Sequence, residues 1–137
     1  MAKPPVDATL TWTHDLVFET QVAAVPGPTL DGDAAVATSP VQALALALGG
    51  CMAIDLVVIL KKGRHDLRGL SLHLVGTRDD GPPAYFTSYT LRFTVTGGIP
   101  DEAIQRAIDL SRDKYCSVWH SLRQDTPLDV TFTRVDA

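Results

Sequence analysis

Hydrophobic and polar residues alternate in three segments, which predicts β-strands there. The alternation falls within residues 70–75, 85–96 and 128–134, and a period of two puts the apolar side chains on one face of a strand. The Asp-Asp-Gly-Pro-Pro sequence at 79–83 predicts a hairpin loop between the first two.

The N-terminal part of the chain has β-strand composition followed by loop composition. Residues 9–13 and 16–22 are rich in β-branched and aromatic residues, with a tight turn expected at His14 and Asp15. Pro, Gly and Asp recur in residues 25–38, which predicts a loop with room for one short strand.

A long apolar helix is predicted in the centre of the chain. Ser39 and Gln42 have the spacing of a capping box, and Pro40 suits the first helical position. The helix is expected to run to about Lys62, with Gly63 as its left-handed stop.

Two glycines interrupt this helix at Gly49 and Gly50. They cost on the order of 2 kcal/mol of helix propensity against two alanines. They indicate either that something approaches the backbone closely just before Cys51, or that the helix packs tightly against a strand. The sequence leaves both interpretations open.

The same apolar stretch meets the minimum length of a membrane span. Residues 43–60 contain a single charge, Asp55, which would be costly in lipid. The amphipathic segments elsewhere need a partner to pack on, and a helix that is apolar all round is also typical of a sheet-wrapped core. We therefore expect a core helix and no membrane partner.

A second helix is predicted after Pro100, with Asp101 and Glu102 in its first turn. Its buried stripe is Ala103, Ile104, Ala107, Ile108 and Ser111. Lys114-Tyr115-Cys116 ends it, and residues 117–123 predict a further helical turn. The order of elements, with antiparallel strands and helices on one face, predicts the α+β class in a single domain, residues 1–137.

Composition narrows the function. The net charge is -4 over 137 residues, which argues against a nucleic-acid partner because a polyanion needs a basic face. Residues 1–7 lack the apolar segment of a signal peptide, so we expect a cytoplasmic protein. Two cysteines in a reducing compartment are expected to be reactive or buried thiols rather than a structural disulfide.

Cys51 and Cys116 are the only thiols and lie 65 positions apart. A cysteine in an apolar helix usually behaves as an inert small hydrophobe. The local sequence favours a reactive thiol at Cys116 more than at Cys51. Cys116 lies where one helix ends and another begins, and a helix N-terminus stabilises a thiolate. Asp55 lies one turn after Cys51; it would raise a neighbouring thiol's pKa, orient a cation, or simply break the apolar surface.

Other candidates are weaker. Cys116 and His120 have a metal-ligand spacing, but no second pair of ligands accompanies them, so no metal site or bound cofactor is expected. The aromatic residues are expected in the core or an interface; they include Trp12, Phe86, Tyr89 and Trp119.

Two segments resemble the OsmC/Ohr family in its OsmC-like branch. The first comprises Ser-Pro at 39–40, Leu-Ala-Leu-Ala-Leu-Gly-Gly-Cys at 44–51 and Asp-Leu-Val-Val-Ile-Leu-Lys-Lys at 55–62. The second comprises Arg-Ala-Ile-Asp-Leu-Ser at 106–111 and Lys-Tyr-Cys-Ser-Val at 114–118. The resemblance extends over about residues 9–135.

This resemblance implies an intertwined homodimer, with antiparallel or mixed sheets wrapped around long central helices and sites at the dimer interface. It also implies reduction of organic hydroperoxides by thiols. Cys51 would be the peroxidatic thiolate and Cys116 the resolving thiol, passing through a sulfenic acid and a disulfide. An external dithiol reductant would close the cycle.

The sequence departs from the family at two positions. Active members pair the reactive cysteine with a Glu after the helix-opening Pro and with an Arg from the first hairpin. Here Val41 and Gln42 follow the Pro, and no Arg precedes Arg64. His14 could supply a partial positive charge in that hairpin, or it is an exposed turn residue. A partner subunit could also supply a cation from Arg78, Arg92 or Arg112.

The leading hypothesis is therefore a thiol peroxidase acting on small organic hydroperoxides, with Cys51, Cys116, His14 and Gln42 as candidate site residues. The alternative is a non-catalytic dimer that binds a small apolar ligand at its interface. A third possibility is thiol chemistry on another electrophile.

Overall fold

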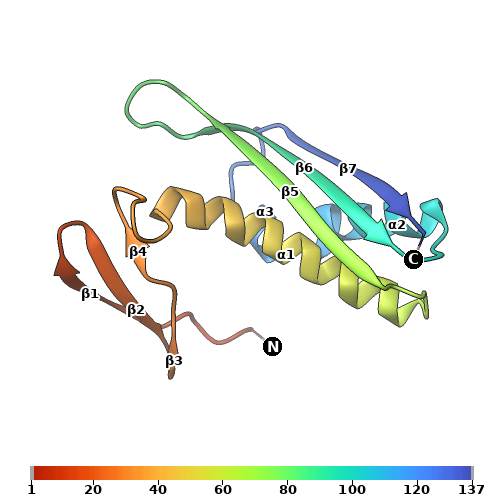
Figure 1. Ribbon diagram of the computed structural model, residues 1–137, viewed down its shortest axis with the longest axis horizontal. Helices are drawn as coiled ribbons and strands as arrows, with labels where there is room; N and C mark the ends of the chain where they lie inside the picture. The colour runs from red at the N-terminus through yellow and green to blue at the C-terminus, as the bar shows by residue number, and fades with distance from the viewer. Residues whose placement is uncertain (1, 137) are drawn as a thin grey trace. The chain divides into compact units, whose positions relative to one another are not determined.

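The computed structural model describes residues 2–136, which divide between Leu44 and Ala45 into two compact units (Figure 1). The long helix runs across this division.

The first unit is built on a β-hairpin. Strands β1 (Ala8–His14) and β2 (Val17–Val22) pair antiparallel. Asp15 takes a positive φ of 47° in the turn, a conformation that Asp tolerates better than most residues. The hairpin prediction is confirmed, with His14 as the last residue of β1. Two short strands, β3 (Val25–Pro26) and β4 (Leu30–Asp31), both pair with β2, so the following loop holds one strand more than expected.

A buried carboxylate fixes the loop after β4. Asp31 is 3% exposed, and its oxygens accept hydrogen bonds from the backbone N–H groups of Asp33, Ala35 and Val36 at 2.9, 3.0 and 3.0 Å. These bonds, that of Val36 above all, lower the pKa of Asp31, because they stabilise the ionised form. The ionised side chain therefore holds together a segment that has little regular secondary structure.

The helix α1 (Pro40–Lys62) begins with the predicted capping box. The Ser39 hydroxyl accepts a hydrogen bond from the Gln42 N–H at 3.2 Å, and the Gln42 side-chain oxygen accepts one from the Ser39 N–H at 3.0 Å. These bonds satisfy donors that a helix start leaves without partners. The prediction is therefore confirmed both for the residue at which the helix begins and for the two residues of the capping box.

The end of α1 differs from the prediction by one residue. The left-handed position is Arg64, with φ of 61°, rather than Gly63. The N–H of His65 bonds to the Leu60 carbonyl, and that of Arg64 to the Lys61 carbonyl, which is the Schellman pattern. A side chain at Gly63 would meet the His65 ring at 2.9 Å. Gly63 therefore does not supply the left-handed backbone, and a larger residue there would require the His65 ring to move.

The second unit contains a three-stranded sheet in the order β5 (Gly69–Arg78), β6 (Phe86–Thr96), β7 (Leu128–Val135). The first pair is antiparallel, as predicted, but β6 and β7 are parallel. The sheet is therefore mixed, one of the two arrangements expected, because the intervening helices return the chain to the same end of the sheet before β7. The α+β class is confirmed.

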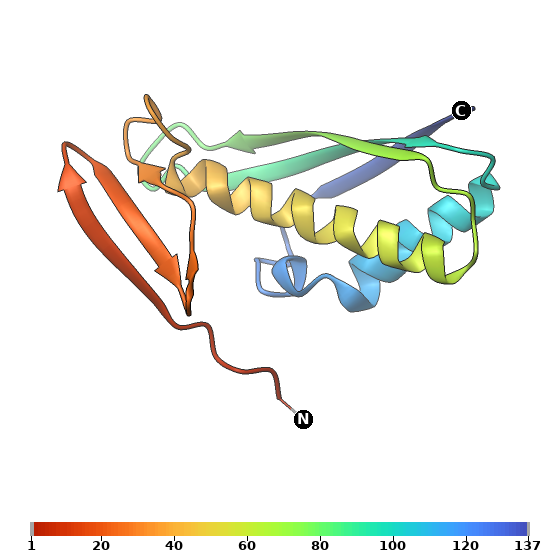
Figure 2. The same cartoon turned by 60° about the horizontal axis from the view of Figure 1, so that its bottom comes forward.

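Three helical segments connect β6 to β7. They are α2 (Asp101–Leu110), the π-helical turn η1 (Ser111–Tyr115) and α3 (Ser117–His120). Within this unit, α1 and α2 lie on the same face of the sheet (Figure 2). The predicted stripe of α2 is confirmed in large part, since Ile104, Ala107, Ile108 and Ser111 are completely buried.

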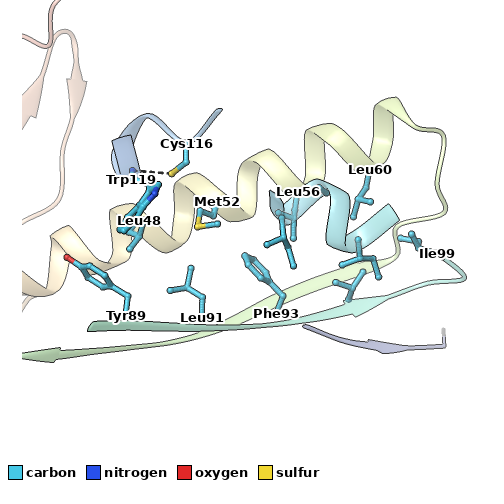
Figure 3. Packing of buried hydrophobic residues seen from close by; sticks show 14 residues of the cluster. Leu48, Met52, Leu56, Leu60, Tyr89, Leu91, Phe93, Ile99, Cys116 and Trp119 are labelled. Carbon is cyan, nitrogen blue, oxygen red and sulfur yellow. Dashed lines mark hydrogen bonds between the residues drawn. The ribbon is translucent and has the colours of Figure 1, made fainter. Parts of the chain in front are cut away.

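The core forms where one face of α1 meets the sheet. Four α1 residues spaced four apart are at most 1% exposed and point toward β6 (Figure 3). They are Leu48, Met52, Leu56 and Leu60. Leu91 and Phe93 of β6 complete the contact. Burying each of these side chains contributes about 1.5–3 kcal/mol, so this contact fixes the rotation of α1 about its axis.

The two glycines of α1 have different environments. A Cβ on Gly49 would lie 3.0 Å from the Leu72 Cδ2 atom and 3.1 Å from the Leu74 Cδ1 atom. Gly49 therefore allows close packing of the helix on β5. A Cβ on Gly50 would meet nothing within 4 Å. The strand-packing interpretation thus holds for Gly49, while Gly50 lies on an open surface of the chain.

The opposite face of α1 is apolar and exposed. Leu46 is 64% exposed, Ile54 65% and Val58 46%. By length and composition alone α1 is also long and apolar enough to cross a membrane. Among the described residues, 33% of the most apolar 18-residue stretch of α1 is buried. The sequence predicts that α1 is covered on all sides. Within a single chain the sheet covers only one face of it.

We predict that Leu56→Ala lowers the free energy of unfolding by about 2–5 kcal/mol, because it leaves a cavity between α1 and β6. Val75→Ala, which changes an exposed residue of β5, should cost less than about 1 kcal/mol. Urea denaturation followed by circular dichroism measures both. Equal losses for the two variants would contradict the assignment of the core face.

Candidate functional site

Three chemically active side chains converge beside the core of the second unit. The sulfurs of Cys51 and Cys116 and a carboxylate oxygen of Asp55 all lie within 4.8 Å of one another. The fold therefore brings together two thiols that are 65 positions apart in the sequence. Two thiols and a carboxylate can carry out redox chemistry or bind a metal ion.

α1 supplies two of the three groups. Cys51 and Asp55 are four residues apart, so their side chains lie on the same side of the helix. The Asp55 Oδ2 atom accepts a hydrogen bond from the Ser111 hydroxyl at 2.8 Å. Ser111 is completely buried, and this bond satisfies its hydroxyl while orienting the carboxylate.

The connection between α2 and α3 supplies Cys116. Its backbone N–H bonds to the Ser111 carbonyl at 2.8 Å, closing the π-helical turn. The chain then becomes extended at Cys116, with ψ of 98°, and α3 begins at the next residue. The Cys116 sulfur accepts a hydrogen bond from the Trp119 N–H at 3.3 Å (Figure 3). The predicted position of Cys116 between two helical segments is confirmed.

The two thiols have different environments. Cys116 is completely buried, whereas Cys51 is partly exposed. Burial raises the pKa of the Cys116 thiol to about 11, and Cys51 and the negative charge of Asp55 act in the same direction. The Trp119 N–H lowers the pKa of Cys116 but does not offset burial. The helix-start argument for a Cys116 thiolate therefore gives the wrong sign, since desolvation outweighs it.

The other candidate residues lie in the first unit. The imidazole of His14 is 64% exposed, with Nδ1 3.0 Å from the Asp15 Oδ2 atom. The side chain of Gln42 forms the capping box with Ser39. Their catalytic roles stay predictions. Of the three candidate arginines, Arg78 donates to the Ala84 carbonyl at 2.8 Å and Arg112 to the Leu128 carbonyl.

Sequence reasoning missed the roles of Ser111 and of the Trp119 N–H. A signal existed for Ser111, because it is the one hydroxyl in the apolar stripe predicted for α2, and a buried hydroxyl needs a partner. Nothing in the sequence indicates that the partner is Asp55. The sequence spacing pairs Cys116 with His120 as metal ligands, whereas the structure groups Cys116 with Cys51 and Asp55.

The family model of OsmC-like proteins matches residues 31–131. The chain belongs to the OsmC-like protein family. The matched segment contains Cys51, Asp55 and Cys116, so the whole cluster lies within the residues that the family model matches.

Individual proteins are similar to this chain in sequence or in fold. Protein YhfA of Escherichia coli K12 is 40% identical over 115 residues, covering 82% of this chain and 86% of its own. A hypothetical protein from Aquifex aeolicus has the same fold, with a TM-score of 0.89, 21% identity and coverage of 98% and 99% of the two chains.

A second similar structure is an organic hydroperoxide resistance protein OsmC of Legionella pneumophila, also described as a predicted redox protein. Its TM-score is 0.70 and its identity 12%, with coverage of 97% of this chain and 99% of its own. Membership of the OsmC-like family therefore supports a role in redox chemistry or stress defence.

We predict that iodoacetamide modifies Cys51 of the folded, reduced protein at least about tenfold faster than Cys116, because only a solvent-accessible thiolate reacts. Peptide mass mapping after timed quenching measures both rates. In urea the two rates should approach each other. A faster reaction at Cys116 in the folded state would contradict the burial described above.

Proposed function

We propose that this OsmC-like protein reduces small organic hydroperoxides to alcohols with its two thiols and is regenerated by an external dithiol. Reduction of the disulfide back to two thiols after each turnover suits the reducing cytoplasm, where we propose the protein acts. The observation that carries this proposal is the approach of the two sulfurs to within 4.8 Å.

The chemistry takes two steps in the protein. The Cys51 thiolate attacks the outer oxygen of the hydroperoxide, the O–O bond breaks, and an alcohol leaves with a proton, while Cys51 becomes a sulfenic acid. The Cys116 thiol then attacks the Cys51 sulfur, and water leaves as the disulfide forms. Thiol–disulfide exchange with a dithiol returns both cysteines to the reduced state.

The difference in burial supports this division of roles. The first thiol must meet a substrate that arrives from solvent, and Cys51 is the partly exposed one. The second thiol must wait and react only with its neighbour. Cys116 suits this role because it is buried, and its pKa of about 11 keeps it protonated and unreactive toward solvent oxidants.

A peroxidatic thiolate also needs a positive charge nearby. The cluster itself supplies a negative charge instead, because its third member is the carboxylate of Asp55. We propose that His14 in the first hairpin contributes this charge, with Gln42 in the place of the family Glu. Arg78, Arg92 or Arg112 of a second subunit is the alternative source.

We predict that one equivalent of cumene hydroperoxide removes two hydrogen atoms from the reduced, metal-free protein, forming the Cys51–Cys116 disulfide. Cys116→Ser should gain one oxygen atom at Cys51, because the resolving thiol is missing. Cys51→Ser should not change within the same time. Intact mass spectrometry follows all three proteins, and an unchanged wild type after minutes would contradict the proposed activity.

We further propose that the protein is a homodimer. The exposed stripe of α1 consists of Leu46, Gly50, Ile54 and Val58, which are spaced four apart on one face. Exposed apolar stripes on this scale mark interaction surfaces. The open space over Gly50 lets a second helix approach the backbone closely. The proposed interface also gives a physical reason for a glycine at an exposed helical position.

We predict that Ile54→Glu shifts the protein from dimer to monomer at micromolar concentration, because it buries a charge in the proposed interface. Val75→Glu adds the same charge at another exposed apolar residue and should leave the dimer intact. Light scattering after size-exclusion chromatography measures the mass. A monomeric wild type, or an Ile54→Glu variant that stays dimeric, would contradict the interface.

One observation favours a second function. A groove of about 340 Å³ runs beside α1 and β5 and is almost wholly apolar. Its lining is Ala53, Ile54, Val57, Val58, Leu70, Ser71 and Leu72. A non-catalytic OsmC-like dimer could bind a small apolar molecule here. This alternative requires a copurifying apolar ligand together with a Cys51 that does not react with hydroperoxide.

A further inference from the structure

Asp55 is the part of the cluster that peroxidase chemistry does not explain. A negative charge beside two thiols disfavours the thiolate that attacks a peroxide, and it contributes to the raised pKa of Cys116. Among the residues that the structure describes, the ion pairs do not include Asp55. A divalent cation reverses this relationship, because it stabilises two thiolates and a carboxylate together.

We infer that the reduced protein binds one Zn²⁺ ion through the Cys51 and Cys116 sulfurs and the Asp55 carboxylate. This site shares atoms with the proposed function but does not depend on it. Binding joins the metal to two sulfurs and one oxygen, and the two thiols release two protons. A disulfide offers no thiolate, so oxidation of the pair removes two of the three ligands.

The distances fit a three-ligand site after small side-chain movements. Zinc bonds are about 2.3 Å to sulfur and 2.0–2.2 Å to carboxylate oxygen, which puts the ligand atoms of a tetrahedron about 3.5–3.8 Å apart. The three atoms here lie within 4.8 Å of one another. Rotations that shift each atom by about 1 Å therefore close the site.

Two of the ligands already have the hydrogen bonds that metal ligands usually receive from the surrounding protein. The Ser111 hydroxyl holds Asp55 by Oδ2, which leaves Oδ1 for a metal. The Trp119 N–H donates to the Cys116 sulfur and would stabilise it as a thiolate. Both donors are fixed by backbone structure, Ser111 by the π-helical turn and Trp119 by α3.

The ligand types select zinc. Two thiolates and one carboxylate combine soft and hard donors, which suits the borderline Zn²⁺ ion better than Cu⁺, which prefers sulfur alone, or Mg²⁺, which prefers oxygen alone. Three protein ligands leave the fourth tetrahedral position for water or another small molecule. The partly exposed Cys51 marks the side on which that position is accessible.

The test is a metal titration of the reduced, metal-free protein. Zn²⁺ added in competition with a chromophoric chelator should bind at one ion per chain. Co²⁺ as a spectroscopic probe should give thiolate-to-metal charge-transfer bands in the near ultraviolet and the visible bands of a tetrahedral ion. Converting the protein to the disulfide with diamide before the titration should abolish both signals.

Variants separate the three-ligand site from binding to thiols alone. Asp55→Asn should weaken Zn²⁺ binding by about 100-fold or more, and Ser111→Ala by about 10- to 100-fold. Cys116→Ser should lose half of the charge-transfer intensity. The matched control is Asp109→Asn, which changes an exposed carboxylate on α2 and should bind as the wild type does. Circular dichroism establishes that each variant is folded.

Two outcomes would overturn the site: no binding by the reduced wild type at micromolar Zn²⁺, or an Asp55→Asn variant that binds as tightly as the wild type. The metal-free peroxide experiment above is independent of both. If the protein forms the disulfide but binds no zinc, the proposed function is supported and the zinc site is contradicted. If it binds zinc but does not react with hydroperoxide, the zinc site is supported and the proposed function is contradicted.

Discussion

The packing of one face of α1 on β6 is the constraint on which the second unit and its site depend. Leu48, Met52, Leu56 and Leu60 fill the space above the sheet. Because a helix is rigid, fixing the positions of these four side chains also fixes the directions of all other side chains on α1. Cys51 and Asp55 are thereby held at the edge of the core, facing the turn that carries Cys116.

The second half of the site depends on an irregular backbone. The π-helical turn ends the helical run that α2 begins and leaves Cys116 extended. One residue serves both purposes, since Ser111 closes this turn with its carbonyl and holds Asp55 with its hydroxyl. The cluster therefore depends on one hydrogen bond between α1 and the α2–α3 connection and on one bond within that connection.

α1 also links the site to the surface. Its core row, its thiol and its exposed stripe are successive faces of one helix. Gly50 of the stripe directly precedes Cys51 in the sequence. A partner that covered the stripe would therefore also lie close to Cys51.

The sequence by itself determined the elements, because period and capping are local: α1 begins at its Ser39–Gln42 capping box, and β5 and β6 follow their alternation. It also singled out both cysteines. Only the tertiary structure decided that β7 is parallel to β6, that Cys116 is buried with a raised pKa, and that Ser111 holds Asp55. These depend on contacts between residues far apart in the chain, and burial and partner identity are properties of the folded chain that no local pattern contains.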